Sequence, residues 1–336
     1  MEKEPSLADW QRLYEAALRF KEAAPWQWMG DLQVFGVRDP EGDAVGYCSI
    51  LGNLGDVFGL VAYLGSEGLV SLSRVARARQ RGAFEAYARQ NCLSLFFGSR
   101  EELTERDRAV VKALGLKFRG STAWPLFRRQ LPGYYPWYLT AEEARFFAAL
   151  IEQATAFCLE LKDNPGLLEP PQPGLVLVRV YDRERGWQST WFSPPPHALP
   201  VAVPGKAALK RIAAQFPRSD ACWETGFFFL PAAVREEETG RPYFPLVMLW
   251  VDRASGLILH MEMTRYGQWQ ALAESFTAAA AAARRLPAEI VTPQEEVAVL
   301  FQDLARGLGI NVKKERSAKS FAAARKYLLQ GMGSQF

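Results

Sequence analysis

Histidine is nearly absent from this 336-residue chain, which contains only His197 and His260. The cysteines are also few, and no two of them form a C-x-x-C pair: Cys48, Cys92, Cys158 and Cys222. A structural zinc site needs about four converging ligands, so we expect none here and interpret the cysteines as buried free thiols. The chain has no G-x-S-x-G motif, and two histidines leave little room for a catalytic triad.

Long apolar runs and a strong net charge are missing as well. The apolar tracts stop well short of the roughly 18 residues that a membrane span needs, and "MEKEPSLADW" is too polar for a signal peptide. The 40 basic and 37 acidic residues give a net charge of +3, which does not favour polyanions. The glycine-rich "LGNLGDVFG" lacks the Lys-Ser/Thr of a nucleotide loop. We expect a cytoplasmic protein with no cofactor and no membrane association.

The composition does provide for substantial cores, since 49% of the residues are hydrophobic and 12% are aromatic. The length predicts about two domains of roughly 150 residues each. Residues 162–174, "KDNPGLLEPPQPG", contain four prolines and two glycines and cannot continue a helix. We therefore predict an α+β domain over residues 1–164, a proline-rich linker over 165–174 and an α/β domain over 175–336.

Helix and turn signals are clear in the first half. Ser6 and Asp9 suit the cap of a helix over "LADWQRLYEAALRF". Thr140 and Glu143 have the spacing of a capping box before "AEEARFFAALIEQATAFCLEL", which carries a continuous apolar stripe. "DPEG", residues 39–42, is typical of a type I turn between two strands.

The second half predicts a particular order of elements over about residues 220–330. "GFFFLPAAV", "FPLVMLWVD" and "LILHMEM" indicate strands, and "WQALAESFTAAAAAARR" indicates a helix. A strand, a helix, a strand and a last helix follow in "AEIV", "QEEVAVLFQDLARGLG", "INVKK" and "SAKSFAAARKYLLQ". Three strands, helix, strand, helix, strand, helix is the order of the ribonuclease H-like fold.

The first half resembles a family of uncharacterised bacterial proteins in several long stretches between about Trp10 and Leu161. The resemblance lies in "LYEAALRFKEAAPWQWM", "FGVRDPEGDAVGYCSILGNLGDVFGLVAYLGSEGL", "CLSLFFGSREEL" and "LGLKFRGSTAWPLFRRQLPGYYPWYLTAEEA". It implies a shared fold for residues 1–161 and brings no catalytic residues, because the family has no established activity. The second half looks like the module that often follows it, which is also of unknown function.

The positions of the carboxylates distinguish an active nuclease from a domain that has only the fold of one. Two-metal chemistry needs several acids near ions roughly 4 Å apart. By element order, Glu224, Glu274 and Glu295 are the available acids. The fourth strand, however, ends in Val291–Pro293 without an aspartate, and the last helix has no acid. Asp252 suits a hairpin aspartate that bonds its own backbone. We therefore expect a catalytically degenerate domain without a metal.

Two kinds of side chain are candidates for binding. The first kind is aromatic residues in two proline-containing stretches: Tyr135, Trp137, Trp187 and Trp191. Such residues could bind a peptide or stacked bases, although aromatic residues also fix loops against a core. Lys319, Arg325 and Lys326 of the last helix suit phosphates, although a solvated helix face has the same pattern.

The leading hypothesis from the sequence is a non-catalytic binding or scaffolding protein with an unidentified protein or peptide partner. A metal-dependent nuclease or phosphotransferase using Glu224, Glu274 and Glu295 is the alternative. Weak nucleic-acid binding through the last helix is a third hypothesis and is less favoured, because the net charge is close to zero.

Overall fold

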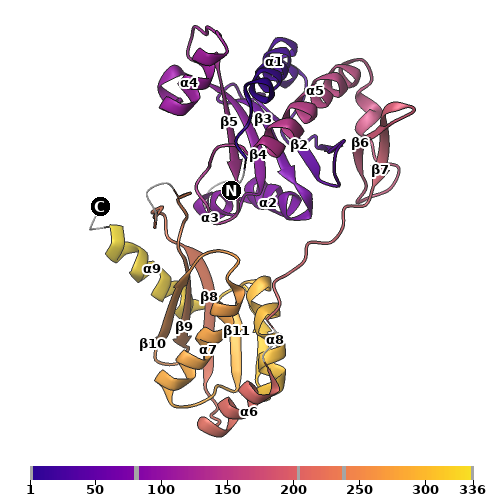
Figure 1. Ribbon diagram of the computed structural model, residues 1–336. Helices are drawn as coiled ribbons and strands as arrows, with labels where there is room; N and C mark the ends of the chain where they lie inside the picture. The colour runs from indigo at the N-terminus through magenta and orange to yellow at the C-terminus, as the bar shows by residue number, and fades with distance from the viewer. Residues whose placement is uncertain (1–2, 79–82, 203–204, 237–239, 334–336) are drawn as a thin grey trace. The chain divides into compact units, whose positions relative to one another are not determined.

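The computed structural model describes residues 3–78, 83–202, 205–236 and 240–333. By its contacts the chain forms two units, the first from Met1–Pro132 and Pro136–His197 and the second from Gly133–Tyr135 and Ala198–Phe336. Each unit combines helices with a mixed sheet, of seven strands in the first and five in the second (Figure 1). No helix in the described ranges has both the length and the apolar character to cross a membrane.

The sheet of the first unit has the strand order β5-β4-β3-β2-β1-β6-β7. Its strands are β1 (Phe35–Arg38), β2 (Val45–Leu51), β3 (Phe58–Leu64), β4 (Cys92–Gly98), β5 (Trp124–Gln130), β6 (Val176–Asp182) and β7 (Gly186–Phe192). Neighbours pair antiparallel except β1 and β6, which are parallel. The helices are α1 (Leu7–Ala23), α2 (Gly65–Arg77), α3 (Ala83–Ala88), α4 (Glu105–Ala113) and α5 (Ala141–Asp163), with short 3-10 turns η1 (Pro25–Gln27), η2 (Arg100–Glu102) and η3 (Pro165–Leu168).

Helices cover both faces of this sheet. The long helices α1 and α5 pack on each other and on one face, where Phe20, Phe35 and Phe147 are fully buried. A smaller core that includes Leu69 and Leu72 of α2 covers the other face. Both predicted caps are confirmed: the amide of Asp9 donates to Ser6 and that of Glu143 donates to Thr140, each over 3.2 Å, and each acid bonds back to its cap residue.

The boundary between the two units differs from the predicted linker at 165–174. Strand β6 follows that proline-rich stretch and pairs in parallel with β1, where Gly36 lies opposite Val178. Leu177 and Val178 are buried, at 5% and 1% exposure. Residues 175–197 therefore belong to the first unit, and the chain enters the second at Ala198. The proline-rich stretch is therefore a loop within the first unit and not the boundary between the units. A strand that follows such a loop can still pair with a strand that is distant in sequence.

The second unit has the element order that the sequence predicts. It consists of α6 (Lys206–Gln215), β8 (Cys222–Phe229), β9 (Leu246–Asp252), β10 (Ile258–Thr264), α7 (Trp269–Ala283), β11 (Glu289–Thr292), α8 (Glu295–Leu308), β12 (Asn311–Lys314) and α9 (Lys319–Gly333). The strand order is β10-β9-β8-β11-β12, with β11 parallel to both β8 and β12. This order is compatible with a ribonuclease H-like fold.

Helices lie on both faces of the second sheet, too. On one face, Trp223 and Trp250 pack edge to face, and both rings contact Phe276 of α7. On the other face, α9 packs across β8 and β9, where Phe321 joins the core with Phe228 and Leu249. Of the residues that the sequence singled out, Glu224 lies beneath α9, and Lys319, Arg325 and Lys326 lie on α9 itself.

Candidate functional site: the face beneath helix α9

Glu224 is the third residue of β8, beneath the start of α9, and its side chain is 1% exposed. Its Oε2 accepts the backbone N–H of Phe321, the third residue of α9, over 2.9 Å. Its Oε1 lies 3.3 Å from Nε of Arg253. A buried carboxylate requires such partners, and a negative charge is stabilising at a helix N-terminus. Glu224 therefore caps α9 from a neighbouring strand.

Arg253 links this carboxylate to the surface. It follows β9, is 43% exposed, and also contacts Glu315 over 3.2 Å. Its hydrogen bonds to Cys222 and to Glu315 raise the pKa of the guanidinium. Both partners of Glu224 are therefore positive or partly positive: the guanidinium of Arg253 and the N-terminal end of α9. This is the environment of a structural ion pair.

The three acids of the nuclease hypothesis do not come together. Glu274 lies on α7, on the sheet face opposite to α9, where it is exposed and accepts a hydrogen bond from Gln270 over 2.9 Å. Glu295 begins α8, is exposed, and pairs with Lys314 of β12. No three His, Cys, Asp or Glu side chains converge as metal ligands anywhere in the described part of the chain.

The hairpin interpretation of Asp252 is confirmed. Its Oδ1 accepts the backbone N–H of Ser255 over 2.9 Å, and its backbone oxygen accepts from Gly256. Burial opposes ionisation of this carboxyl, but the bonds from Ser255 and the charge of Arg285 outweigh it and lower the pKa.

Gln294 occupies the place where the fourth strand, β11, ends. Its Oε1 accepts the N–H of Phe227 and its Nε2 donates to the carbonyl of Phe227, both over 2.8 Å. The ladder between β8 and β11 ends at the pair Glu224 and Val291, so the Gln294 amide continues the pairing where the strands part. Gln294 is not among the candidate residues from the sequence. The sequence feature that could have pointed to it is Gly226, because a glycine within an apolar strand often marks a close approach of other groups. In the structure, a Cβ at Gly226 would lie 2.7 Å from Phe321 and 2.9 Å from Gln294.

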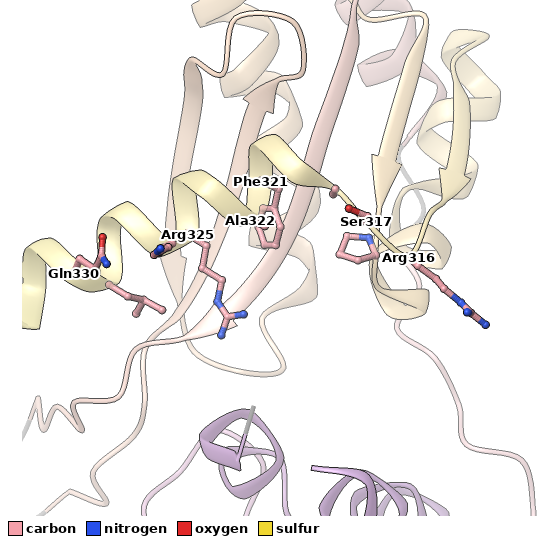
Figure 2. A pocket seen from close by; sticks show the side chains of 10 residues that line it. Arg316, Ser317, Phe321, Ala322, Arg325 and Gln330 are labelled. Atoms are coloured by element: carbon pink, nitrogen blue, oxygen red, sulfur yellow. The ribbon is translucent and has the colours of Figure 1, made fainter. Parts of the chain in front are cut away.

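A cavity of about 530 Å³ opens beside α9 (Figure 2). We call it the α9 groove. Its lining combines apolar and cationic side chains: Pro293, Arg316, Ser317, Ala318, Phe321, Ala322, Arg325, Lys326, Leu329 and Gln330. Figure 2 shows Phe321, Ala322, Arg325 and Gln330 along the helix, with Arg316 and Ser317 on the segment before it. None of the ten lining residues is acidic, so the lining carries a net positive charge.

The predicted basic residues divide between this groove and open surface. Arg325 and Lys326 line the groove, and the guanidinium of Arg325 also lies 5.3 Å from the ring centre of Phe228. Lys319 is exposed in the first turn of α9 and does not line the groove. Arg316, which is not among the candidates from the sequence, does line it.

The aromatic candidates take part in contacts within their own units. Tyr135, 48% exposed, donates its backbone N–H to Pro242 in the second unit. Trp137 pairs with Arg129 through two backbone hydrogen bonds, of 2.8 and 2.9 Å, in the first unit. Trp187 and Trp191, on β7, are half-buried and pack against the first core. These contacts favour the alternative interpretation, in which aromatic residues fix loops and edges to a core.

The cysteines are free thiols, as predicted. Cys48, Cys92 and Cys158 are buried, whereas Cys222 is only partly so. Burial raises the pKa of Cys92 to about 12, so at neutral pH this thiol is protonated and unreactive.

Comparison with known proteins shows what the chain resembles. The family model described as "Domain of unknown function (DUF7309)" matches residues 10–179, half of the chain. The chain belongs to this DUF7309 family. A second model, "Domain of unknown function (DUF6930)", matches residues 208–329. The DUF7309 match ends inside β6, and the DUF6930 match spans Glu224, Gln294 and most of the α9 groove.

No curated protein matches the chain in sequence. Among solved structures, a chain of the simian T-cell lymphotropic virus intasome in complex with PP2A regulatory subunit B56 gamma shares 16% identity with it. The match covers 40% of this chain and 43% of that chain, with a TM-score of 0.26. The chain thus spans less than half of that relative's length, and a likeness of this size carries no argument about function.

Proposed function

We propose that this DUF7309 protein is a non-catalytic binding protein, and that its second unit is a ribonuclease H-like domain whose acid site has become structural. The observation that carries the proposal is the position of Glu224. It occupies the first-strand place of a nuclease acid, yet it is 1% exposed and bonds the start of α9 and Arg253. A carboxylate used in this way has little capacity left for a metal ion.

Two further features support the loss of catalysis. At the end of β11, where a second acid would be needed, the Gln294 amide bonds the backbone of Phe227. Helix α9 brings Phe321 rather than an acid to Glu224. Mg²⁺ depends on oxygen ligands and loses water reluctantly, so one engaged carboxylate is too few.

The α9 groove is the proposed binding site, and an acidic, partly apolar segment of a partner protein is the proposed ligand. Phe321, Ala322 and Leu329 offer apolar contact, while Arg316 and Lys326 offer positive charge at the surface. The volume, about 530 Å³, suits one or two side chains of such a segment. A nucleic-acid backbone fits the charges but makes no use of the apolar lining.

The absence of catalysis is tested by incubating the full chain with Mg²⁺ or Mn²⁺ and single- or double-stranded DNA and RNA. We expect no cleavage above a protein-free control. Glu224→Gln is expected to lower the free energy of unfolding by about 1.5 kcal/mol, because a buried charged hydrogen bond weakens. Glu274→Gln, at an exposed site, is the matched control and should change it by less than about 0.5 kcal/mol. Cleavage that is lost in Glu224→Gln would establish the nuclease alternative.

Binding in the groove is tested with a fluorescein-labelled peptide that alternates glutamate and leucine, and with its lysine–leucine counterpart. The acidic peptide should bind at least tenfold more tightly, and Arg316→Glu with Lys326→Glu should abolish the difference. Lys210→Glu with Arg211→Glu, on the exposed face of α6, is the charge-matched control. Equal binding of both peptides, or equal loss in both double variants, would contradict the assignment of the groove.

A further inference from the structure

Strand β10 forms one outer edge of the second sheet (Figure 1). Within the described residues it pairs only with β9, so its other edge leaves backbone N–H and C=O groups open. Exposed edges are usually protected by proline, lysine or charge pointing along the edge. The sequence of β10, "ILHMEMT", contains no proline and no lysine, and its register shift lies at the start of the strand, between Ile258 and His260.

One face of this edge is apolar and exposed. Met261 lies opposite Leu249 and Met263 lies opposite Val247, so both methionines share the sheet face on which α9 packs. Leu249 and Val247 are buried, at 0% and 1% exposure, whereas Met261 and Met263 are 45% and 51% exposed. The apolar face of the sheet therefore continues onto β10 without being covered there.

The opposite face of the edge carries a pair of complementary polar groups. His260 and Glu262 lie opposite Trp250 and Met248, and Nε2 of His260 is 3.3 Å from Oε2 of Glu262. Their side chains remain 27% and 34% exposed. Neighbouring positions on one face of a strand are two residues apart, so His260 and Glu262 lie on either side of Met261 along the edge.

We propose that β10 pairs antiparallel with β10 of a second copy of this chain, about a two-fold axis at Met261. In that register His260 lies opposite the partner's Glu262 and Glu262 opposite the partner's His260, and both positions lie beyond the register shift between Ile258 and His260. A two-fold axis at Glu262 instead sets two glutamates directly opposite each other, and like charges in that position are unfavourable. A self-complementary patch of this kind is what a two-fold dimer requires.

The neighbouring helix leaves room for this approach. Gln270, Ala273, Glu274 and Thr277 of α7 line a cleft shared with α6 and α8. By helical periodicity the opposite flank of α7, toward the β10 edge, carries Ala271, Ala278 and Ala282. Alanine side chains permit two α7 helices to lie close together above the joined sheets. The pairing does not depend on the α9 groove, so it stands or fails independently of the proposed function.

A cysteine at the axis tests the register directly. Directly opposite residues of an antiparallel pair have Cα atoms about 4.5–5.5 Å apart, within the range that a disulfide bridges. In a Cys222→Ser background, Met261→Cys should form a disulfide-linked dimer on mild oxidation. Met263→Cys, two residues away and similarly exposed, should not, because with the axis at Met261 the two copies of residue 263 lie on opposite sides of the axis and are too far apart to bridge. Equal cross-linking of both variants would overturn the register.

Association in solution tests the interface itself, by sedimentation of the full chain over a range of concentrations. We expect a reversible dimer with a Kd on the order of 10 μM, since strand-edge interfaces of small area are weak. Met261→Arg should raise this Kd at least tenfold, because it places two like charges together at the axis. Tyr327→Arg, at a 76% exposed site on α9, should leave it unchanged. A chain that stays monomeric at about tenfold above that Kd, or a dimer that Met261→Arg does not weaken while circular dichroism shows it folded, would overturn the proposal.

Discussion

Carboxylates at helix starts recur in this molecule at the scale of single residues. Asp9, Asp107 and Glu143 each bond back to the cap residue three positions earlier, in a motif that the sequence itself displays. Glu224 has the same role for α9, but it comes from a strand 97 residues away. The local caps are therefore visible in the sequence, and the long-range one is not.

Asp107 gives a prediction about pH. Its carboxylate binds Arg128 through two hydrogen bonds, of 2.9 and 2.6 Å, and both side chains are largely buried, at 12% and 14% exposure. Burial opposes ionisation, but the hydrogen bonds and charge of Arg128 outweigh it, so the pKa of Asp107 is lowered. A pKa that is lower in the folded state stabilises the fold above the unfolded value of about 3.9, and this contribution is lost as the pH falls through the lowered pKa.

We therefore expect Asp107→Asn to destabilise the protein by about 1–2 kcal/mol above pH 5, and the difference to vanish in strong acid. Urea unfolding of both proteins between pH 2 and pH 7 measures it. Glu105→Gln, on the same helical turn and exposed, is the control and should show little change. A difference that persists unchanged at the lowest pH would contradict the ionic origin of the contribution.

At the scale of elements, α9 has two faces with different tasks. Ala318, Phe321 and Ala324 are buried in the core that α9 shares with β8 and β9. Lys319 and Lys326 are exposed, and Arg325 is half-buried over Phe228. The buried face packs the helix onto the sheet, and the charge of the cationic face favours acidic ligands.

Nucleic-acid binding by α9 is expected to be weak. The chain has a net charge of only +3, so the helix cations act without a wider positive field. At 0.15 M salt the Debye length is about 8 Å, which screens such exposed charges. We expect no binding tighter than about 10 μM under these conditions.

A salt titration by fluorescence anisotropy, with single-stranded and double-stranded DNA and RNA, measures this affinity. The triple variant Lys319→Ala, Arg325→Ala, Lys326→Ala should differ little from the unchanged protein at 0.15 M salt. Submicromolar binding that this variant loses, with a log–log salt slope of roughly 0.7 to 0.9 per phosphate contact, would instead make nucleic acid the ligand of α9.

At the scale of the whole molecule, the position of β6 decides how the chain can be divided. Val178 of β6 lies so close to Gly36 of β1 that a Cβ there would approach its Cγ2 to 2.9 Å. Leu177 belongs to the first core together with Phe35 and Phe157. A fragment that ends at residue 164 therefore loses two strands and exposes the edge of β1.

We expect a fragment of residues 1–197 to fold cooperatively, and a fragment of residues 1–164 to unfold at a clearly lower temperature or to aggregate. Thermal unfolding by circular dichroism and analytical gel filtration distinguish the two. A fragment of residues 1–174, which ends just before β6, is the control for chain length and should behave like the shorter one. Equal stability of all three fragments would restore the boundary at 165–174.

The sequence by itself determined the local features of this protein. The caps at Ser6 and Thr140, the turn at Asp252 and the element order of residues 220–330 depend on neighbours within a few positions or on the period of apolar residues. Such signals remain in the sequence because each element must bury its own apolar face.

Only the tertiary structure decided which distant segments meet. It joined β6 to β1 across a proline-rich stretch, set Gln294 against Phe227 and placed Glu224 beneath the start of α9. Pairing and capping between remote segments leave no periodic trace, since any strand edge or buried carboxylate can accept more than one partner. The sequence therefore showed that a carboxylate occupies β8, and the fold determined that this carboxylate holds a helix.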